Sequence, residues 1–204
     1  MRVKVGLLLF LLPLLAIRGA GVPAQVKAGA TAARVWGIQQ LMQSLQQVKS
    51  ASSQFVERKY LHVLDQPLIA SGTLLYVAPD QVQKITVSPK WERLALAGDT
   101  LTIEGGAEDR NRTLSLARYP EVGALVEGIR ATLAGDLPAL QRFYEISLSG
   151  DAADWQLALV PKDATLRKLV KSILIAGSGN TIRRVMTEDA DGDHSDMSIV
   201  ETAR

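Results

Sequence analysis

Cysteine is absent from this chain of 204 residues. Its absence excludes disulfide bonds, a thiol nucleophile, cysteine-based metal sites and the attachment of lipid to an N-terminal cysteine. A protein without such links depends on its hydrophobic core, and about 180 residues suffice for one core. The sequence therefore predicts one globular domain rather than a small disulfide-held scaffold.

Residues suited to catalysis are also scarce. The chain has two histidines, His62 and His194, and its Gly177-Ser178-Gly179 segment lacks the G-x-S-x-G spacing of a nucleophile elbow. A pair of hydrolase carboxylates would have to come from one predicted polar turn, which holds Glu104, Glu108 and Asp109. We therefore expect no catalytic residues, and a hydrolase is kept only as a lesser alternative.

The chain has one long apolar run, Gly6 to Ile17, and it follows two basic residues. The run is shorter than the roughly 20 residues of a membrane-spanning helix, as in a secretory signal. We expect a signal peptide over 1–24, cut near Ala24, and one exported, soluble domain over 25–204. Arg18 at the end of the run leaves a retained N-terminal anchor as the alternative.

Charge outside this signal is balanced. Three of the 23 basic residues and none of the 21 acidic ones lie within 1–24, which leaves 20 basic residues against 21 acidic ones. No basic patch rich in aromatic residues occurs, so we expect no nucleic-acid partner. Acidic residues gather at Asp189–Asp196, but a calcium loop would need Gly and Glu where His194 and Val200 stand. The pattern favours a solvated hairpin, and we expect no metal and no cofactor.

Short apolar runs separated by turn residues make up most of the chain. Their alternation predicts ten or eleven strands, and the short gaps require antiparallel neighbours. The expected strands are 53–62, 74–78, 81–87, 91–97, 100–104, 112–117, 144–149, 155–160, 171–176, 181–189 and 195–201. So many strands in one domain leave edges exposed unless the sheet curls towards closure. The fold class is therefore α+β, with a curled antiparallel sheet.

Two stretches instead have the period of a helix. Apolar residues recur at three- and four-residue spacing within 29–53, which predicts an amphipathic helix that packs on the core. A second helix is expected over 121–134, with shorter helical pieces over 137–144 and 164–170. The apolar side of the second helix has no partner except the sheet, so it should act as a lid. Its underside would consist of Val122, Leu125, Val126, Ile129 and Leu133.

A curled sheet under a loosely packed lid encloses an apolar cavity. The residues expected to form its wall are large and apolar and alternate along the strands: Leu74, Tyr76, Leu94, Leu96, Leu101, Ile103, Trp155, Leu157 and Leu159. A register error of one residue would turn any of these strands inside out. Core packing is the alternative role for the tryptophan.

The segment Gly72 to Pro79 carries a resemblance to a known family. It is followed by Pro89, ten residues after Pro79, then by Gly98-Asp99-Thr100-Leu101, and a late hairpin spans Ile173 to Ile182. In this order and spacing the chain, over roughly 35–200, resembles the periplasmic carriers of outer-membrane lipoproteins, the LolA-like family. The resemblance implies an incomplete, half-open antiparallel barrel that is covered by an N-terminal helix and a central lid helix.

The resemblance also implies a non-catalytic function. Such a carrier or chaperone shields acyl chains in the periplasm, takes its cargo from an inner-membrane exporter, delivers it to an outer-membrane acceptor and acts as a monomer. Each acyl CH₂ removed from water contributes roughly 0.8 kcal/mol, so a sixteen-carbon chain requires on the order of 10 kcal/mol of shielding. The other class left open is a periplasmic sensor or adaptor domain that binds a membrane-protein partner.

Two departures separate this chain from the best-known carriers. Ala78 stands where those carriers have an arginine that tethers the lid, and the sequence stops at Arg204, soon after 195–201, where those carriers have an extra segment. An inward-pointing Lys84 would be a replacement for the arginine. The departures are similar to those of a divergent branch of the family, so the expected cargo is a lipoprotein or a lipid-like molecule such as a glycolipid, a fatty acid or an aryl-polyene lipid.

Overall fold

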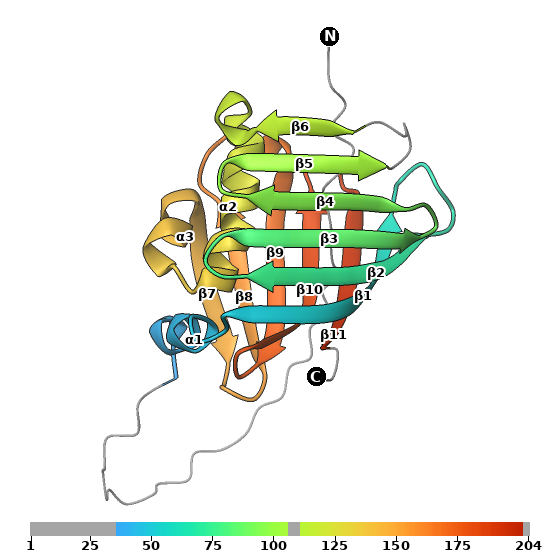
Figure 1. Ribbon diagram of the computed structural model, residues 1–204. Coiled ribbons are helices and arrows are strands. Elements are labelled where there is room, and N and C mark those ends of the chain that lie inside the picture. The colour runs from blue at the N-terminus through green and yellow to red at the C-terminus, as the bar shows by residue number, and fades with distance from the viewer. Residues whose placement is uncertain (1–35, 106–110, 202–204) are drawn as a thin grey trace, which may run out of the picture.

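The computed structural model describes residues 36–105 and 111–201. Its main feature is one antiparallel sheet of 11 strands in the order β6-β5-β4-β3-β2-β1-β11-β10-β9-β8-β7. Figure 1 shows β2–β6 crossing in front of β7–β11, with β1 passing from one half to the other. The two end strands, β6 and β7, do not pair with each other, so the sheet curls without closing into a barrel. The predicted α+β class and half-open barrel are confirmed.

The strands follow the predicted order. In the first half they are β1 (Ser50–Tyr60), β2 (Leu68–Val77), β3 (Gln81–Ser88), β4 (Glu92–Ala97), β5 (Thr100–Gly105) and β6 (Arg112–Ser115). In the second half they are β7 (Tyr144–Gly150), β8 (Trp155–Pro161), β9 (Val170–Ser178), β10 (Thr181–Asp189) and β11 (His194–Glu201). Short turns such as Gly98, with a φ of 55°, join neighbours in the sheet.

The first helix is much shorter than expected. Helix α1 spans Ile38–Leu45, and β1 begins at Ser50, within the stretch predicted to be helical up to residue 53. Ser50 already pairs with Val77 of β2. The helix buries Leu41, Met42 and Leu45, and beyond it sheet pairing prevails over the helical periodicity. Residues 29–35 of the predicted helix and the signal over 1–24 lie outside the described residues.

Helix α2 (Pro120–Ala134) begins and ends close to its predicted limits. Proline occupies its first position, where no backbone N–H is needed, and Gly135 ends it in the left-handed conformation with a φ of 66°. Helix α3 (Leu137–Phe143) follows at once, and the Asp136 carboxylate accepts a hydrogen bond of 2.9 Å from the Ala139 N–H at its start. Two short 3₁₀ turns, Leu116–Arg118 and Leu166–Lys168, complete the helical elements.

The core consists of two apolar clusters that meet at α2. The larger one joins α1, α3 and β7–β9 and includes the fully buried Trp155. The smaller one joins β4, β5 and the 3₁₀ turn at Leu116. Helix α2 contributes Leu125 to the first cluster and Val126 to the second. Because one helix packs in both clusters, its position determines how the two halves of the sheet face each other.

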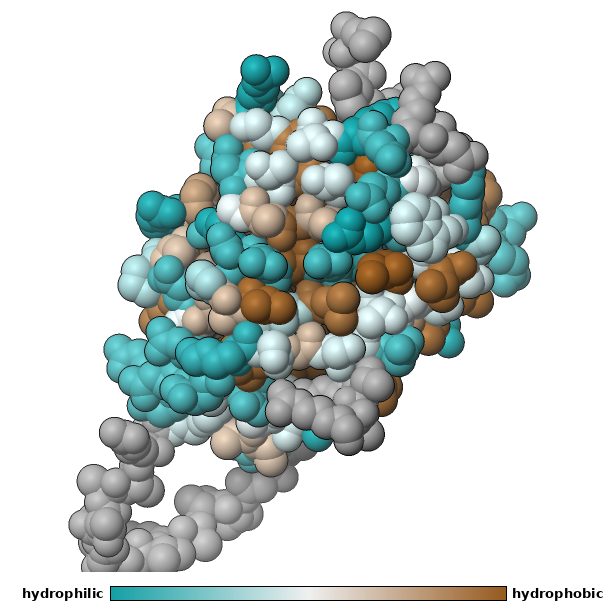
Figure 2. Space-filling model, viewed as in Figure 1, coloured by the Kyte–Doolittle hydropathy of each residue, from teal (hydrophilic) through white to brown (hydrophobic). Residues whose placement is uncertain are grey.

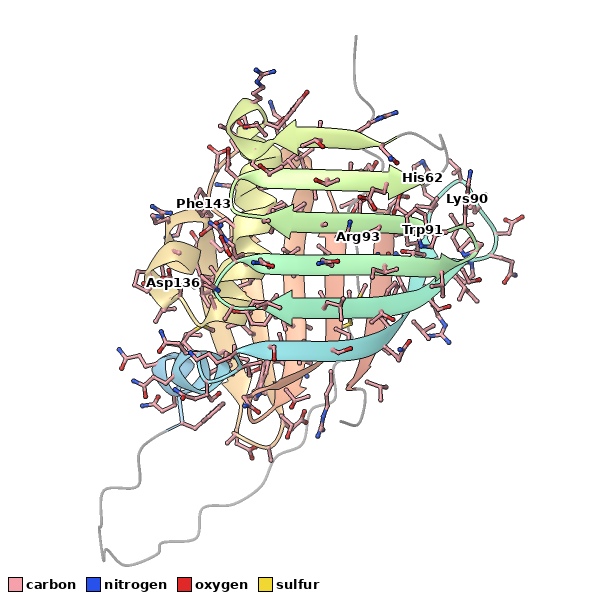
Figure 3. The ribbon with its side chains drawn as sticks, viewed as in Figure 1. His62, Lys90, Trp91, Arg93, Asp136 and Phe143 are labelled. Carbon is pink, nitrogen blue, oxygen red and sulfur yellow. The ribbon has the colours of Figure 1, made fainter. Side chains whose placement is uncertain are left out.

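The outer face of the front strands is mixed in polarity. Figure 2 shows apolar side chains among polar ones there, and the exposed large apolar residues include Val77, Val87 and Trp91. Trp91 and Lys90 lie with His62 at the end of the sheet away from the helices, whereas Asp136 and Phe143 lie on the helical side (Figure 3). The concave inner face is far more apolar, and an apolar cavity lies against it.

Candidate functional site

An apolar cavity of about 230 Å³ lies between α2 and the inner face of the sheet. The lid helix supplies part of its wall through Leu125, Val126, Ile129 and Leu133. Strands of the first half of the sheet contribute Leu74, Tyr76, Val82, Leu94, Leu96 and Leu101. Strands of the second half contribute Leu159, Ile173, Ile175, Ile182, Val185, Met197 and Ile199.

Strand register explains why these side chains share one face. Leu74 lies opposite Lys84, and Lys84 lies opposite Leu94. One pair along, Tyr76 lies opposite Val82. Residues directly opposite each other in a sheet point to the same side, so alternate positions on β2, β3, β4 and β5 form one continuous inner surface.

Most of the residues predicted for the cavity are brought together. Of the predicted wall, Leu74, Tyr76, Leu94, Leu96, Leu101 and Leu159 line the cavity. Of the predicted lid underside, Leu125, Val126, Ile129 and Leu133 line it. That these residues contact lipid stays a prediction.

Four predicted residues lie elsewhere. Trp155 is fully buried in the larger core cluster, where its indole N–H donates to the Gly179 carbonyl at 3.0 Å, and Leu157 packs in the same cluster. Val122 and Ile103 pack in the smaller cluster. All four are on the inner face or the lid, but other side chains cover them, so they support the wall instead of forming it.

Sequence reasoning missed the part of the wall that comes from β9–β11. Ile173 and Ile175 alternate along β9, and Val185 and Met197 pair across β10 and β11. The signal was available, because each lies in a strand that was predicted. The pattern within a strand does not show that β9–β11 face β2–β4 across the cavity.

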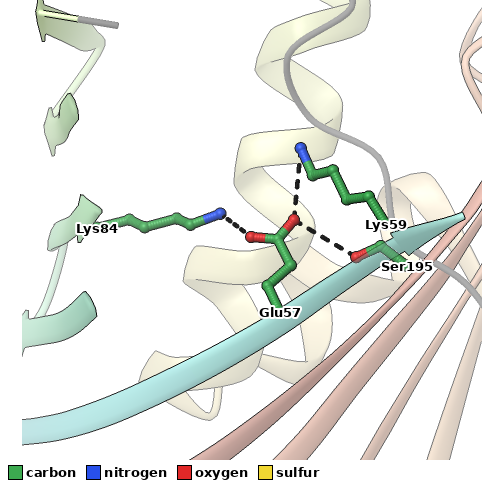
Figure 4. Close-up of polar contacts among 4 residues, drawn as sticks. All are labelled: Glu57, Lys59, Lys84 and Ser195. Carbon is green, nitrogen blue, oxygen red and sulfur yellow. Dashed lines mark hydrogen bonds and ion pairs between the residues drawn. The ribbon is translucent and has the colours of Figure 1, made fainter. Parts of the chain in front are cut away.

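A buried polar cluster adjoins the apolar wall (Figure 4). Glu57 of β1 is fully buried and pairs with the Lys84 ammonium through Oε2. Its Oε1 lies 3.4 Å from Lys59 Nζ and accepts a hydrogen bond of 3.4 Å from the Ser195 hydroxyl. Burial lowers the pKa of Lys84, and the Glu57 carboxylate opposes this effect. Lys84 does point inward, as the replacement for the missing arginine would require, and it lines the cavity.

Because Gly72 of β2 has no side chain, Glu57 of β1 and Lys84 of β3 can meet across that strand. Gly72 lies between them on the inner face, opposite Phe55 of β1 and Thr86 of β3. A Cβ at Gly72 would come within 1.9 Å of the Ile85 carbonyl oxygen, so the backbones are close here. Lys84 instead extends over the Phe55 ring, with Nζ 5.1 Å from its centroid. The Lys84 side chain thus reaches across β2, and its ammonium meets the Glu57 carboxylate.

The acidic hairpin between β10 and β11 is held by hydrogen bonds. Asp193 Oδ1 accepts from the His62 backbone N–H at 2.8 Å and lies 2.7 Å from its ring Nδ1, and this lowers the pKa of Asp193. Carboxylate oxygens of Asp189, Asp191 and Asp193 lie within 4.8 Å of one another. A cluster of this kind is common on protein surfaces without an ion, so it gives no metal site on its own.

The carboxylates considered for hydrolysis do not form a described pair. Glu104 makes an ion pair with Arg93 at 3.0 Å. Glu108 and Asp109 lie outside the described residues. Among the residues that the structure describes, no helix has the length and apolar character needed to cross a membrane.

Comparison with solved structures gives distant likenesses. A LolA superfamily protein from Nitrosomonas europaea is 12% identical with a TM-score of 0.43, over 82% of this chain and 93% of that one. A DUF1329 family protein from Desulfovibrio piger is 10% identical with a TM-score of 0.45, over 80% and 88% of the two chains. The MucA/MucB complex of Pseudomonas aeruginosa is 12% identical with a TM-score of 0.43, over 81% of this chain and 56% of that one.

Comparison with curated proteins finds no match. The comparison with protein families gives a more specific result than the comparisons with solved structures and curated proteins. The family described as outer membrane lipoprotein carrier protein LolA-like matches residues 30–204, which include all of the described elements. The chain therefore belongs to the LolA-like family of outer-membrane lipoprotein carrier proteins.

Proposed function

We propose that this protein is a non-catalytic periplasmic carrier that shields the acyl chains of a lipoprotein or lipid-like molecule on its way from the inner to the outer membrane. The single observation that carries the proposal is the apolar cavity between α2 and the inner face of the sheet. Membership of the LolA-like family supports it. The donor would be an inner-membrane exporter and the acceptor an outer-membrane protein.

The cavity has the right chemistry for this task. Its wall is built mostly from Leu, Ile, Val and Met side chains, and an acyl chain buried against them leaves water at a gain of roughly 0.8 kcal/mol per CH₂. A carrier must also release its cargo. A wall with few polar groups holds the chain without strong directional contacts, and a helical lid that shifts would let it leave.

Binding of a fluorescent fatty-acid analogue to the purified protein tests the proposal. Leu125→Asp or Ile129→Asp would place a charge in the cavity wall and should weaken binding at least ten-fold, because an acyl chain cannot solvate a carboxylate. Val87→Asp is the matched control, since Val87 is 60% exposed on the outer face, and it should bind as the wild type does.

Mass spectrometry of protein isolated from its native periplasm should find a bound lipid and an N-terminus near residue 25. If no lipid copurifies and no acyl probe binds, the carrier is excluded, and an adaptor that binds a membrane-protein partner takes its place.

A further inference from the structure

Lys84 is the one charged side chain among the described residues that line the cavity. Its neighbours in the wall are apolar, with Leu74 and Leu94 directly opposite it on the adjacent strands. Tyr76, also in the wall, has a buried hydroxyl without a hydrogen-bond partner. A container for acyl chains alone would need neither group, since each costs free energy to bury.

Glu57 is shared by two lysines. Lys84 contacts one of its carboxylate oxygens, while Lys59 and the Ser195 hydroxyl contact the other at 3.4 Å. If Lys84 turned to another partner, Glu57 would keep a cation and a hydrogen-bond donor. The usual penalty for leaving a buried charge unpaired is thereby reduced.

A second carboxylate acts on Lys84 from the side away from the lid. Glu92 also acts electrostatically on Lys84, but it lies opposite Thr86, one pair further from the lid along the same face. Asp189 interacts electrostatically with Lys59. Val82 and Leu96 continue the wall from Lys84 towards α2, and no carboxylate is among the described residues that line the cavity.

We propose that Lys84 binds the anionic head of the cargo, so that the ligand is an amphiphile with an acyl chain and a carboxylate or phosphate oxygen at one end. The acyl chain lies under α2, and the head reaches the ammonium at the edge of the apolar wall. This inference rests on the proposed function, because it names the chemistry of the cargo for the same cavity.

Competition against a fluorescent acyl probe tests it with three ligands of equal chain length: hexadecanoate, hexadecyl phosphate and hexadecanol. The wild type should bind at least one anionic ligand about ten-fold more tightly than the alcohol, because the ammonium can donate a charge-assisted hydrogen bond to the anionic head. Lys84→Met should remove this preference and keep the binding of hexadecanol. Lys84→Arg should restore the preference, and Lys171→Met, which removes an exposed lysine of the outer surface, should leave it intact.

The outcomes separate the two proposals. If no ligand binds, the carrier function itself fails. If all three bind equally well to the wild type, or if Lys84→Met keeps the preference, the cavity is an acyl site and the anionic head is excluded. Preference for the carboxylate alone, or for the phosphate alone, identifies the source of the anion. If Lys84→Met does not fold, Glu57→Gln with Lys84→Met replaces it, since no buried carboxylate is then left behind.

Discussion

At the scale of single residues, Asp189 lies where the charged form of its carboxylate is disfavoured. It lies at the end of β10, where one of its carboxylate oxygens is buried without a hydrogen-bond partner. Burial, together with the nearby Asp191 and Asp193, raises its pKa to about 7, and Lys59 acts in the opposite direction. Ionisation of Asp189 is therefore opposed in the folded protein, and the stability of the fold depends on pH.

The contribution of Asp189 to the stability of the wild type should fall as the pH rises from about 4 to about 7. An unfolded aspartate has a pKa of about 3.9, so over this range the folded protein binds more protons than the unfolded one, and deprotonation favours unfolding. Asp189→Asn should remove this component and make the variant more stable than the wild type at pH 8, as measured by melting temperature across the range. Asp65→Asn, in an exposed loop, controls for the loss of one charge. A constant difference between Asp189→Asn and wild type at every pH would contradict the prediction.

At the scale of elements, α2 is held by close contacts with the first residue of β7 and with α1. The Tyr144 hydroxyl donates to the Ala124 carbonyl at 3.3 Å, and its ring packs so closely on Gly128 that a Cβ there would lie 2.6 Å from it. At the end of the helix, Gly135 packs against the Met42 carbonyl oxygen of α1, which is 2.2 Å from the place of a Cβ. The lid helix thus has a tight backbone contact at its C-terminal end.

Gly135→Ala should destabilise the protein more than Gly179→Ala. Both glycines have a positive φ, 66° and 56°, so both variants should lose about 1 kcal/mol to backbone strain. At Gly179 nothing lies within 4 Å of the new Cβ, whereas at Gly135 it meets the backbone of α1, which should cost roughly 1–3 kcal/mol more. Urea unfolding at equilibrium measures the difference. Equal losses in the free energy of unfolding would show that α1 shifts to make room for the new methyl group at no cost.

At the scale of the whole molecule, the unclosed edge of the sheet determines how a cavity of this size could take up a larger cargo. The cavity, at about 230 Å³, is smaller than the roughly 300–1,000 Å³ of typical ligand pockets. Strands β6 and β7 leave the sheet unclosed, so no ladder of hydrogen bonds prevents its two halves from separating. A cargo with more than one acyl chain would therefore have to displace α2 from the sheet.

Distance measurements between spin labels should detect this displacement. Because the chain has no cysteine, Gln54→Cys on the outer face of β1 and Glu127→Cys on α2 give two unique labelling sites. The distance between them should increase when cargo binds. The pair Gln54→Cys and Gln81→Cys lies wholly within the sheet and should keep its distance. If the first pair also keeps its distance with cargo bound, α2 is a fixed part of the wall.

The sequence by itself determined which segments are strands and where the lid helix lies. Alternation with a period of two and the turn residues between runs are local signals, and Pro120 and Gly135 delimit α2 through backbone geometry alone. The inner positions of β2, β4 and β5 followed from the same alternation. The family could also be recognised at this level, because its motifs are a matter of order and spacing along the chain.

Only the tertiary structure decided which inner-facing residues meet the cavity and which are covered. Trp155 and Leu159 alternate on one strand and both pack in the larger core cluster, yet of the two only Leu159 also lines the cavity. The start of β1 depended on pairing with β2. Glu57 and Lys84 are 27 residues apart and meet across a third strand, at a place where Gly72 has no side chain. Contacts of this kind arise from the packing of distant segments, which local periodicity does not encode.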